Sequence, residues 1–221
     1  APRAVAAALS GHNAAMFVTL EGPEGAGKST LAAGLADGLR RLGHDPLVTR
    51  EPGAGALGGR IREILLYGDD LPHRTELFLF LADRAHHVAA VVRPALAAGR
   101  IVICDRHADS TLVYQSLVRG LDEAFVRAAN RFATDGLSPD VTLLVDLPPE
   151  VGLSRIVNPD RLDAQPLAFH RAVREGFLRV AAAEPDRFRR LDGTRSPSEV
   201  LAAALAALAP VLRPGEQPGL F

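Results

Sequence analysis

The run from Gly22 to Thr30, GPEGAGKST, has the residue types and spacing of a loop that binds nucleotide phosphates. It fits the pattern G-x-x-x-x-G-K-[ST] at every fixed position, and it lies between an apolar run and a helix-like segment. Glycines let backbone N–H groups turn towards an anion, and the following helix adds the positive end of its dipole. Residues expected to bind a donor nucleotide here are Gly22, Glu24, Gly25, Ala26, Gly27, Lys28, Ser29 and Thr30. The loop predicts a nucleoside triphosphate site in which Lys28 reaches the β- and γ-phosphates and Ser29 binds Mg²⁺.

Charged pairs follow two apolar runs further along the chain. Arg50 and Glu51 come after a short run, and Asp105 and Arg106 come after a longer one. A guanidinium group can bind a phosphate through two parallel hydrogen bonds, and it stays charged at any working pH. We therefore expect Arg50 and Arg106 to hold an acceptor phosphate, and Asp105 to orient Mg²⁺ or its waters. Asp146 also ends an apolar run, but there a turn or helix-capping role is the favoured alternative.

Apolar runs typical of buried strands alternate with helix-like segments along the chain. We expect strands at residues 16–20, 47–49, 101–104, 141–145 and 187–191. The expected helices cover about residues 28–43, 60–66, 75–98, 109–118, 122–133, 167–183 and 197–209. This order is typical of a three-layer α/β/α fold with a central five-stranded parallel sheet and right-handed crossovers. Ligands of such sheets bind at the carboxyl ends of the strands, where the charged residues described above are expected.

The bulk composition narrows the class of protein. The chain has 221 residues, of which 48% are hydrophobic, and this is enough for one substantial core in one α/β domain. A formal net charge of −1 gives no electrostatic case for binding nucleic acid or an anionic membrane. No apolar run is long enough to span a bilayer. Cys104 is the only cysteine, so no disulfide can form within the chain, and we expect a cytoplasmic protein.

Several segments of the chain together resemble the thymidylate kinase family of P-loop nucleoside monophosphate kinases. They are the phosphate loop, TREPG at residues 49–53, ELFLFLADR at 76–84, DRHADSTLVYQ at 105–115 and VDLPPE at 145–150. The resemblance covers about residues 16–210. It implies that the protein phosphorylates dTMP to dTDP with ATP and Mg²⁺ in dTTP biosynthesis. It also implies a homodimer formed through apolar helices, for which residues 75–98 are a candidate, although burial in the core explains their apolar side chains equally well.

The resemblance implies roles for individual side chains. Thymine would stack on Phe80 and receive hydrogen bonds from Arg84, which lies four residues further on the same helix face. Tyr114 would crowd the 2′ position of the sugar and favour deoxyribose, and Glu51 would brace an arginine. Phe78 is expected in the core. The substrate-binding residues implied are Glu24, Arg50, Glu51, Phe80, Arg84, Arg106, Ser110, Thr111, Tyr114 and Gln115.

A lid that closes over the phosphates is expected at about residues 152–165, because a kinase must keep water from the transferred group. This segment is short and contains two arginines, Arg155 and Arg161. We expect Arg161 to reach the transferred phosphate and Arg155 to assist at the donor nucleotide, with solvated surface charges as the alternative. The expected catalytic residues are Lys28, Asp105, Arg106 and Arg161, and the expected metal-binding residues are Ser29 and Asp105.

Two terminal segments flank the expected kinase domain at residues 16–213. Residues 1–15 have the character of an N-terminal extension, and residues 214–221 that of a tail. The last five residues, QPGLF, resemble the Q-x-x-L-F peptide that binds the bacterial sliding clamp, and a plain tail is the favoured alternative.

Two other functions stay open on the sequence. A kinase for another pyrimidine monophosphate would need a different base pocket in the same fold. A regulatory NTPase would keep the phosphate loop and lack acceptor chemistry. Only a kinase would release ADP at a rate that depends on an added monophosphate.

Overall fold

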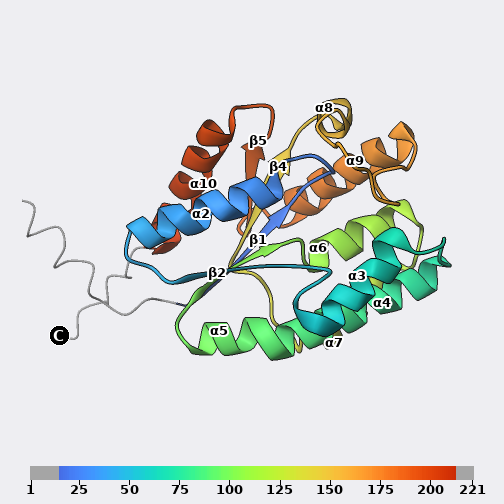
Figure 1. Ribbon diagram of the computed structural model, residues 1–221, viewed down its shortest axis with the longest axis horizontal. Coiled ribbons are helices and arrows are strands. Elements are labelled where there is room, and N and C mark those ends of the chain that lie inside the picture. Colours follow the sequence, from blue (N-terminus) through green and yellow to red (C-terminus); the bar gives the residue numbers. More distant parts are fainter. Residues whose placement is uncertain (1–14, 213–221) are drawn as a thin grey trace, which may run out of the picture.

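A parallel sheet forms the centre of the computed structural model, which describes residues 15–212 (Figure 1). Its strands are β1 (Met16–Glu21), β2 (Pro46–Arg50), β3 (Ile101–Asp105), β4 (Val141–Asp146) and β5 (Phe188–Asp192). They pair in the order β2-β3-β1-β4-β5, and every pairing is parallel. The expected five-stranded parallel sheet is confirmed, with each strand within a residue or two of its expected bounds.

The helices match the expected ones in place and differ in detail. The helices are α2 (Lys28–Arg41), α3 (Gly55–Tyr67), α4 (His73–His87), α5 (Arg93–Ala97), α6 (Ala108–Thr111), α7 (Glu123–Ala133), α8 (Pro149–Leu153), α9 (Leu167–Ala183) and α10 (Pro197–Leu212), with π-helical η1 (Val88–Val92) and η2 (Leu112–Val118). The long helix expected at residues 75–98 is therefore α4, η1 and α5 in succession. The short α8 begins at Pro149, in agreement with the helix start expected after Asp146, and it carries proline in its first turn.

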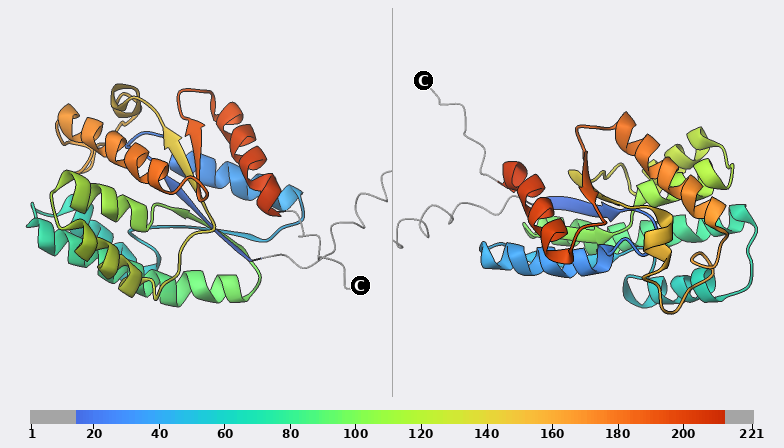
Figure 2. Two further views of the ribbon diagram at one scale, coloured as in Figure 1. Left: turned by 180° about the vertical axis from the view of Figure 1, so that it is seen from behind. Right: turned by 90° about the horizontal axis from the view of Figure 1, so that it is seen from above.

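Helices cover both faces of the sheet, because the apolar side chains of the strands point to both sides and must be buried. Val18 of β1 packs in one core with Leu35 of α2 and Ala204 of α10. Figures 1 and 2 show α2 and α10 together on that face. On the other face, Leu144 of β4 packs with Phe177 of α9. Strand side chains that alternate between two apolar layers are typical of parallel sheets in α/β proteins.

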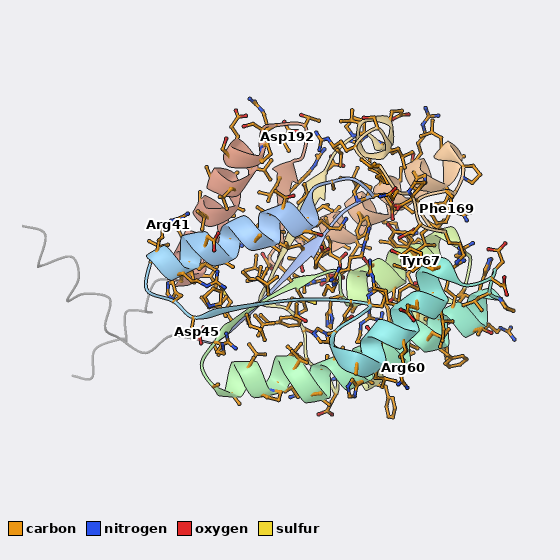
Figure 3. All side chains as sticks on the ribbon, in the orientation of Figure 1. Arg41, Asp45, Arg60, Tyr67, Phe169 and Asp192 are labelled. Atoms are coloured by element: carbon orange, nitrogen blue, oxygen red, sulfur yellow. The ribbon has the colours of Figure 1, made fainter. Side chains whose placement is uncertain are left out.

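The register of the strands brings three chain segments together at one end of the sheet. Asp105 lies opposite both Leu20 of β1 and Arg50 of β2. The carboxyl ends of β1, β2 and β3 therefore meet, as expected for a ligand site of this fold. Helix α2 begins at this end and runs away from it, so Arg41 and Asp45 lie at the far end of the molecule from Phe169 (Figure 3).

One core prediction is wrong. The side chain of Phe78 is 58% exposed, whereas Leu77 and Leu81 of the same helix are buried. Residues 1–14 of the expected N-terminal extension and the clamp-like peptide lie outside the described residues. Within residues 15–212, no helix combines the length and the apolar character needed to cross a bilayer.

Candidate active site

The phosphate loop connects β1 to α2, and its glycines have positive φ angles. Gly25 and Gly27 have φ angles of 67° and 86°. A Cβ on Gly25 would lie 1.9 Å from the carbonyl oxygen of Gly152, and a Cβ on Gly152 would lie 2.2 Å from the carbonyl oxygen of Glu24. The loop and α8 thus touch backbone to backbone. Lys28 folds over the loop and donates to the carbonyls of Gly22 and Pro23 at 3.0 and 2.8 Å. Its burial, aided by nearby Arg106, lowers the pKa of the Lys28 ammonium to about 8.

Ser29 and Asp105 meet beside this loop, as expected from the sequence. The Ser29 hydroxyl donates to Asp105 Oδ2 over 2.6 Å. A hydroxyl and a carboxylate are hard oxygen ligands of the kind that Mg²⁺ prefers. The donor set therefore fits a magnesium ion bound at the phosphate loop. Asp146, the alternative carboxylate, instead forms ion pairs with Arg174 and Arg190 at the end of β4.

A cavity beside the phosphate loop brings together most of the residues expected to bind the acceptor. It is about 200 Å³ in volume. Expected residues that line it are Glu24, Glu51, Phe80, Arg84, Arg106, Ser110, Thr111, Tyr114 and Gln115. These side chains come from the phosphate loop, the β2–α3 connection, α4, the β3–α6 connection, the end of α6 and η2. The cavity thus has an aromatic ring, amide and guanidinium groups and a basic end at Lys28 and Arg106, a combination that suits a nucleoside monophosphate.

Arg84 is the best-fixed group in this cavity, and Glu51 braces it as expected. Arg84 is 1% exposed. Its Nε donates to Glu51 Oε2 at 2.8 Å, and its Nη1 donates to Thr111 Oγ1 and Asn130 Oδ1 at 2.9 and 2.7 Å. Burial alone would raise the pKa of Glu51, but His107 and Arg84 hold the pKa of this carboxyl well below its usual range. The arrangement fixes both the charge and the orientation of the guanidinium.

Glu51 also lies in a buried cluster with His87 and Cys104, whose ligand atoms are within 4.8 Å of one another. Glu51 Oε1 lies 2.7 Å from His87 Nδ1, and the Cys104 thiol donates to the carbonyl of Arg106 at 3.1 Å. Burial raises the pKa of Cys104 well above its usual range, so the thiol keeps its proton. Each of the three groups therefore has a hydrogen-bond partner within the protein: Glu51 and His87 pair with each other, and Cys104 bonds to the Arg106 backbone.

Arg106 and Tyr114 converge on Glu24 at the basic end of the cavity. Arg106 Nη2 donates to Glu24 Oε1 at 3.2 Å and its Nη1 donates to Ser110 Oγ at 3.0 Å. The Tyr114 hydroxyl donates to the same Glu24 oxygen. Arg106 has φ 68°, which is unusual for a residue with a side chain, and its N–H is held by the carbonyl of Leu20 at 3.0 Å. The guanidinium is therefore fixed before any phosphate arrives.

A second, larger cavity of about 710 Å³ adjoins the other side of the phosphate loop. Its lining includes Arg155, as expected, and also Arg195 and Pro197 near the start of α10. Arg155 Nη1 donates to the carbonyl of Gly193 at 3.1 Å. The two cavities share Gly25, Lys28 and Ser29. Two ligands would therefore meet at the phosphate loop.

Comparison with known proteins gives one consistent result. A sequence model described as thymidylate kinase matches residues 20–204. The thymidylate kinase of Synechococcus sp. (strain JA-2-3B'a(2-13)) is 52% identical over 197 residues, which cover 89% of this chain and 96% of that protein. The thymidylate kinase of Desulfovibrio desulfuricans is 49% identical over 210 residues, covering 90% of this chain and 97% of that protein.

The chain belongs to the thymidylate kinase family. The crystal structure of the Ehrlichia chaffeensis thymidylate kinase superposes with a TM-score of 0.74 at 29% identity, covering 88% of this chain and 98% of the other. The fold and family predictions are confirmed. The chain is a kinase that transfers phosphate from ATP to dTMP, and neither a kinase for another pyrimidine nor a regulatory NTPase is favoured.

Two arginines expected in a thymidylate kinase site are not among the described residues that line the acceptor cavity. Arg50 is exposed at the end of β2. Arg161 donates to the Leu65 carbonyl at 2.9 and 3.0 Å and to Glu76 Oε2 at 2.6 Å. The structure therefore ties the lid arginine to α3 and α4, and a role in phosphate transfer requires that residues 160–165 move.

The structure adds residues to the thymidylate kinase site that the sequence did not single out. Arg62 of α3 lines the acceptor cavity, and it donates to the Pro52 carbonyl at 3.0 Å. Asp163 lines the cavity from the lid, and His170 of α9 bonds to Glu24. Arg62 could have been found as a helix position four residues before Leu66, which also lines the cavity. His170 carries no local signal, because its partner lies 146 residues away.

Proposed function

We propose that dTMP binds in the cavity lined by Phe80 and Arg84, and that ATP binds in the larger cavity beside Arg155. The observation that carries this assignment is the shared boundary of the cavities at Gly25, Lys28 and Ser29. A phosphate-binding loop belongs where the donor triphosphate meets the acceptor. With this placement, the larger volume receives the larger nucleotide.

The base end of dTMP is recognised by groups whose hydrogen-bond directions are already fixed. Arg84 has its Nε and Nη1 committed to protein partners, which leaves Nη2 to donate to a carbonyl oxygen of thymine. Gln115 Nε2 donates to Glu76 Oε1 at 2.9 Å, so its amide oxygen can accept from the base. Cytosine would place its amino group, a donor, where Arg84 also donates. Both donors would then be left without an acceptor, so binding of cytosine is disfavoured. A missing methyl costs only about 1 to 3 kcal/mol, so dUMP should be disfavoured about 10- to 200-fold.

The chemical step needs alignment more than proton transfer. An oxygen of the dTMP phosphate attacks the γ-phosphorus of ATP, the bond to the β,γ-bridging oxygen breaks, and ADP leaves with that electron pair. Arg106 and Arg62 would hold the attacking phosphate. Arg62 would thus take the role that was expected of Arg50. Lys28 would neutralise charge on the transferred group. Ser29 and Asp105 would hold Mg²⁺, which supplies charge neutralisation on the donor phosphates when bound.

We also propose a homodimer that works in the cytoplasm. Support for the dimer comes from large apolar side chains exposed on α3, α4 and α7. Phe78 is 58% exposed, Tyr67 70% and Phe132 90%. Exposed aromatic groups of this size are typical of protein interfaces. The cytoplasmic location rests on a nucleotide substrate pair and on a lone, buried Cys104. Sedimentation of the purified chain, compared with Phe78→Asp, tests the dimer.

A coupled assay of ADP release tests the proposed function. The purified chain is supplied with ATP and Mg²⁺, and then with dTMP, dUMP, UMP, CMP or dGMP in separate reactions. We expect rapid ADP release with dTMP, slower release with dUMP, and background rates with the others. ADP release that is the same with and without dTMP would contradict the assignment.

A further inference from the structure

His170 lies buried between the phosphate loop and the lid, with both ring nitrogens engaged. It is the fourth residue of α9 and is 1% exposed. Its Nδ1 lies 3.3 Å from Glu24 Oε2. Its Nε2 lies 3.2 Å from the carbonyl oxygen of Asp163 and 3.1 Å from that of Gln165. One imidazole ring thus contacts a carboxylate on one side and the lid backbone on the other.

The partners of His170 decide which ring nitrogens carry protons. Carbonyl oxygens only accept hydrogen bonds, so Nε2 must donate to Asp163 and Gln165. A neutral ring with its proton on Nε2 would turn the lone pair of Nδ1 towards the Glu24 carboxyl. That contact is favourable only if Glu24 carries a proton, or if Nδ1 does.

The other partners of Glu24 favour its charged form over a protonated carboxyl. Glu24 Oε1 accepts from Arg106 Nη2 and from the Tyr114 hydroxyl. Burial would raise the pKa of Glu24, but the hydrogen bond with His170 and the charges of Arg106 and Lys28 lower it to about 2. Glu24 is therefore a carboxylate, and His170 is an imidazolium that donates from both nitrogens. In agreement, the bond with Glu24 raises the pKa of His170.

We propose that His170, as a doubly protonated ring, is a positioning residue that couples the lid to the acceptor site. It joins the backbone at residues 163–165 to Glu24, and Glu24 in turn fixes Arg106 and Tyr114. Asp163 and Glu24 both line the acceptor cavity, so the ring joins two residues of its lining. This inference rests on the proposed placement of dTMP and adds a residue that would not touch the nucleotide.

The arrangement predicts a pH-dependent link between the lid and dTMP binding. Loss of the Nδ1 proton, as the pH rises through the raised pKa of His170, breaks the bond to Glu24 while the bond to the lid stays. The effect on dTMP binding is therefore fully present at low pH and is lost as the pH rises. Titratable and charged groups that face His170 and Glu24 are Lys28 of α2, Arg106 after β3, Tyr114 of η2, and Asp163 of the lid, which in turn interacts with Asp160.

The protonation state can be tested directly in the wild-type protein. Nitrogen-15 NMR of histidine-labelled protein reports the protons on each ring nitrogen, and His170→Gln identifies the His170 signals by their loss. We expect both nitrogens of His170 to be protonated at pH 7, with titration above the usual histidine pKa of about 6.5. A single ring proton at pH 7 would overturn the inference. This readout does not depend on activity, and the His170→Gln variant serves only to assign the signals.

The coupling is tested by steady-state kinetics of two variants. His170→Gln keeps one donor, and His170→Phe keeps a ring against Phe169, whose centroid is 5.4 Å from that of His170 (Figure 3 marks Phe169). Loss of a hydrogen bond to a charged group corresponds to about a tenfold or larger fall in kcat/KM for dTMP. We expect KM for ATP to change little, since Glu24 faces the acceptor cavity, and the ratio of wild-type to His170→Gln kcat/KM should shrink as the pH rises.

His86→Gln is the matched control, because His86 is exposed on α4 and should leave both the rate and its pH dependence unchanged. An unchanged kcat/KM for dTMP in both His170 variants would overturn the coupling. A wild-type protein that fails to use dTMP would instead contradict the proposed function, while the NMR result would still decide the protonation of His170.

Discussion

Replacement of Arg84 by lysine tests whether the base pocket depends on a fixed guanidinium fork. Arg84 makes hydrogen bonds to Glu51, Thr111 and Asn130 and is almost fully buried. A lysine keeps the charge, but its single ammonium on a different stem cannot reach all three partners and the base as well. We expect at least two of these bonds to be lost.

The expected size of the effect follows from these bonds. A hydrogen bond that involves a charged group contributes about 1.5 to 3 kcal/mol, so the loss of two predicts destabilisation by about 3 to 6 kcal/mol. If one base contact is also lost, kcat/KM for dTMP should fall about 10- to 100-fold, while KM for ATP stays near the wild-type value. Urea denaturation measures the first quantity, and the coupled ADP assay measures the second.

The control is Arg74→Lys, an exposed position on the same helix, which should behave like the wild type in both assays. An Arg84→Lys protein with wild-type stability and with kcat/KM for dTMP within a factor of two of the wild type would refute the reasoning. It would mean that the guanidinium fork neither holds the pocket nor reads the base.

Further predictions concern the metal, the arginines and acid stability. Asp105→Asn should lower activity at limiting Mg²⁺, with partial recovery as the Mg²⁺ concentration is raised; equal activity at all concentrations would remove Asp105 from the metal site. Arg161→Ala should lower kcat about tenfold or more if the lid arginine reaches the transferred phosphate, and an unchanged kcat would leave Arg161 as a link to α3 and α4 alone. Arg62→Ala should raise KM for dTMP about tenfold and Arg50→Ala should not, because Arg62 lines the described cavity and Arg50 does not. A larger rise in KM for Arg50→Ala than for Arg62→Ala would show that the expectation from the sequence was right. The folded-state pKa of Glu24, about 2, lies below its unfolded value of 4.5, so its stabilising contribution is present above pH 4.5 and is lost as the pH falls towards 2. Over that range, the free energy of unfolding should fall by about 3 kcal/mol less for Glu24→Gln than for the wild type.

The sequence predicted the parts of the site that rest on local patterns. The phosphate loop needs glycines at fixed spacing, and β3 needs an apolar run, so Lys28, Ser29 and Asp105 could be placed before the structure was known. Parallel strands end at one edge, and this brought Asp105 to Ser29 in space. Helical spacing placed Phe80 and Arg84 on one helix face, and the resemblance to thymidylate kinases implied their roles at the base.

The remainder depended on contacts between distant segments. Arg161 could be assigned to the lid, but its bond to Glu76 joins residues 85 apart in the chain. Phe78 was misplaced because an apolar residue in a helical segment does not reveal which face the helix buries. The π-helical turns of η1 and η2 carry no composition of their own, so the sequence could give only an uninterrupted helix there.

The backbone contact between Gly25 and Gly152 limits how the lid can be redesigned. Neither position has room for even a methyl group, because each Cβ would overlap a carbonyl oxygen of the other segment. A longer, arginine-bearing lid grafted from another kinase would therefore have to be joined after residue 152. A graft that begins earlier would press on the phosphate loop and distort the cradle for ATP before the new arginines could act.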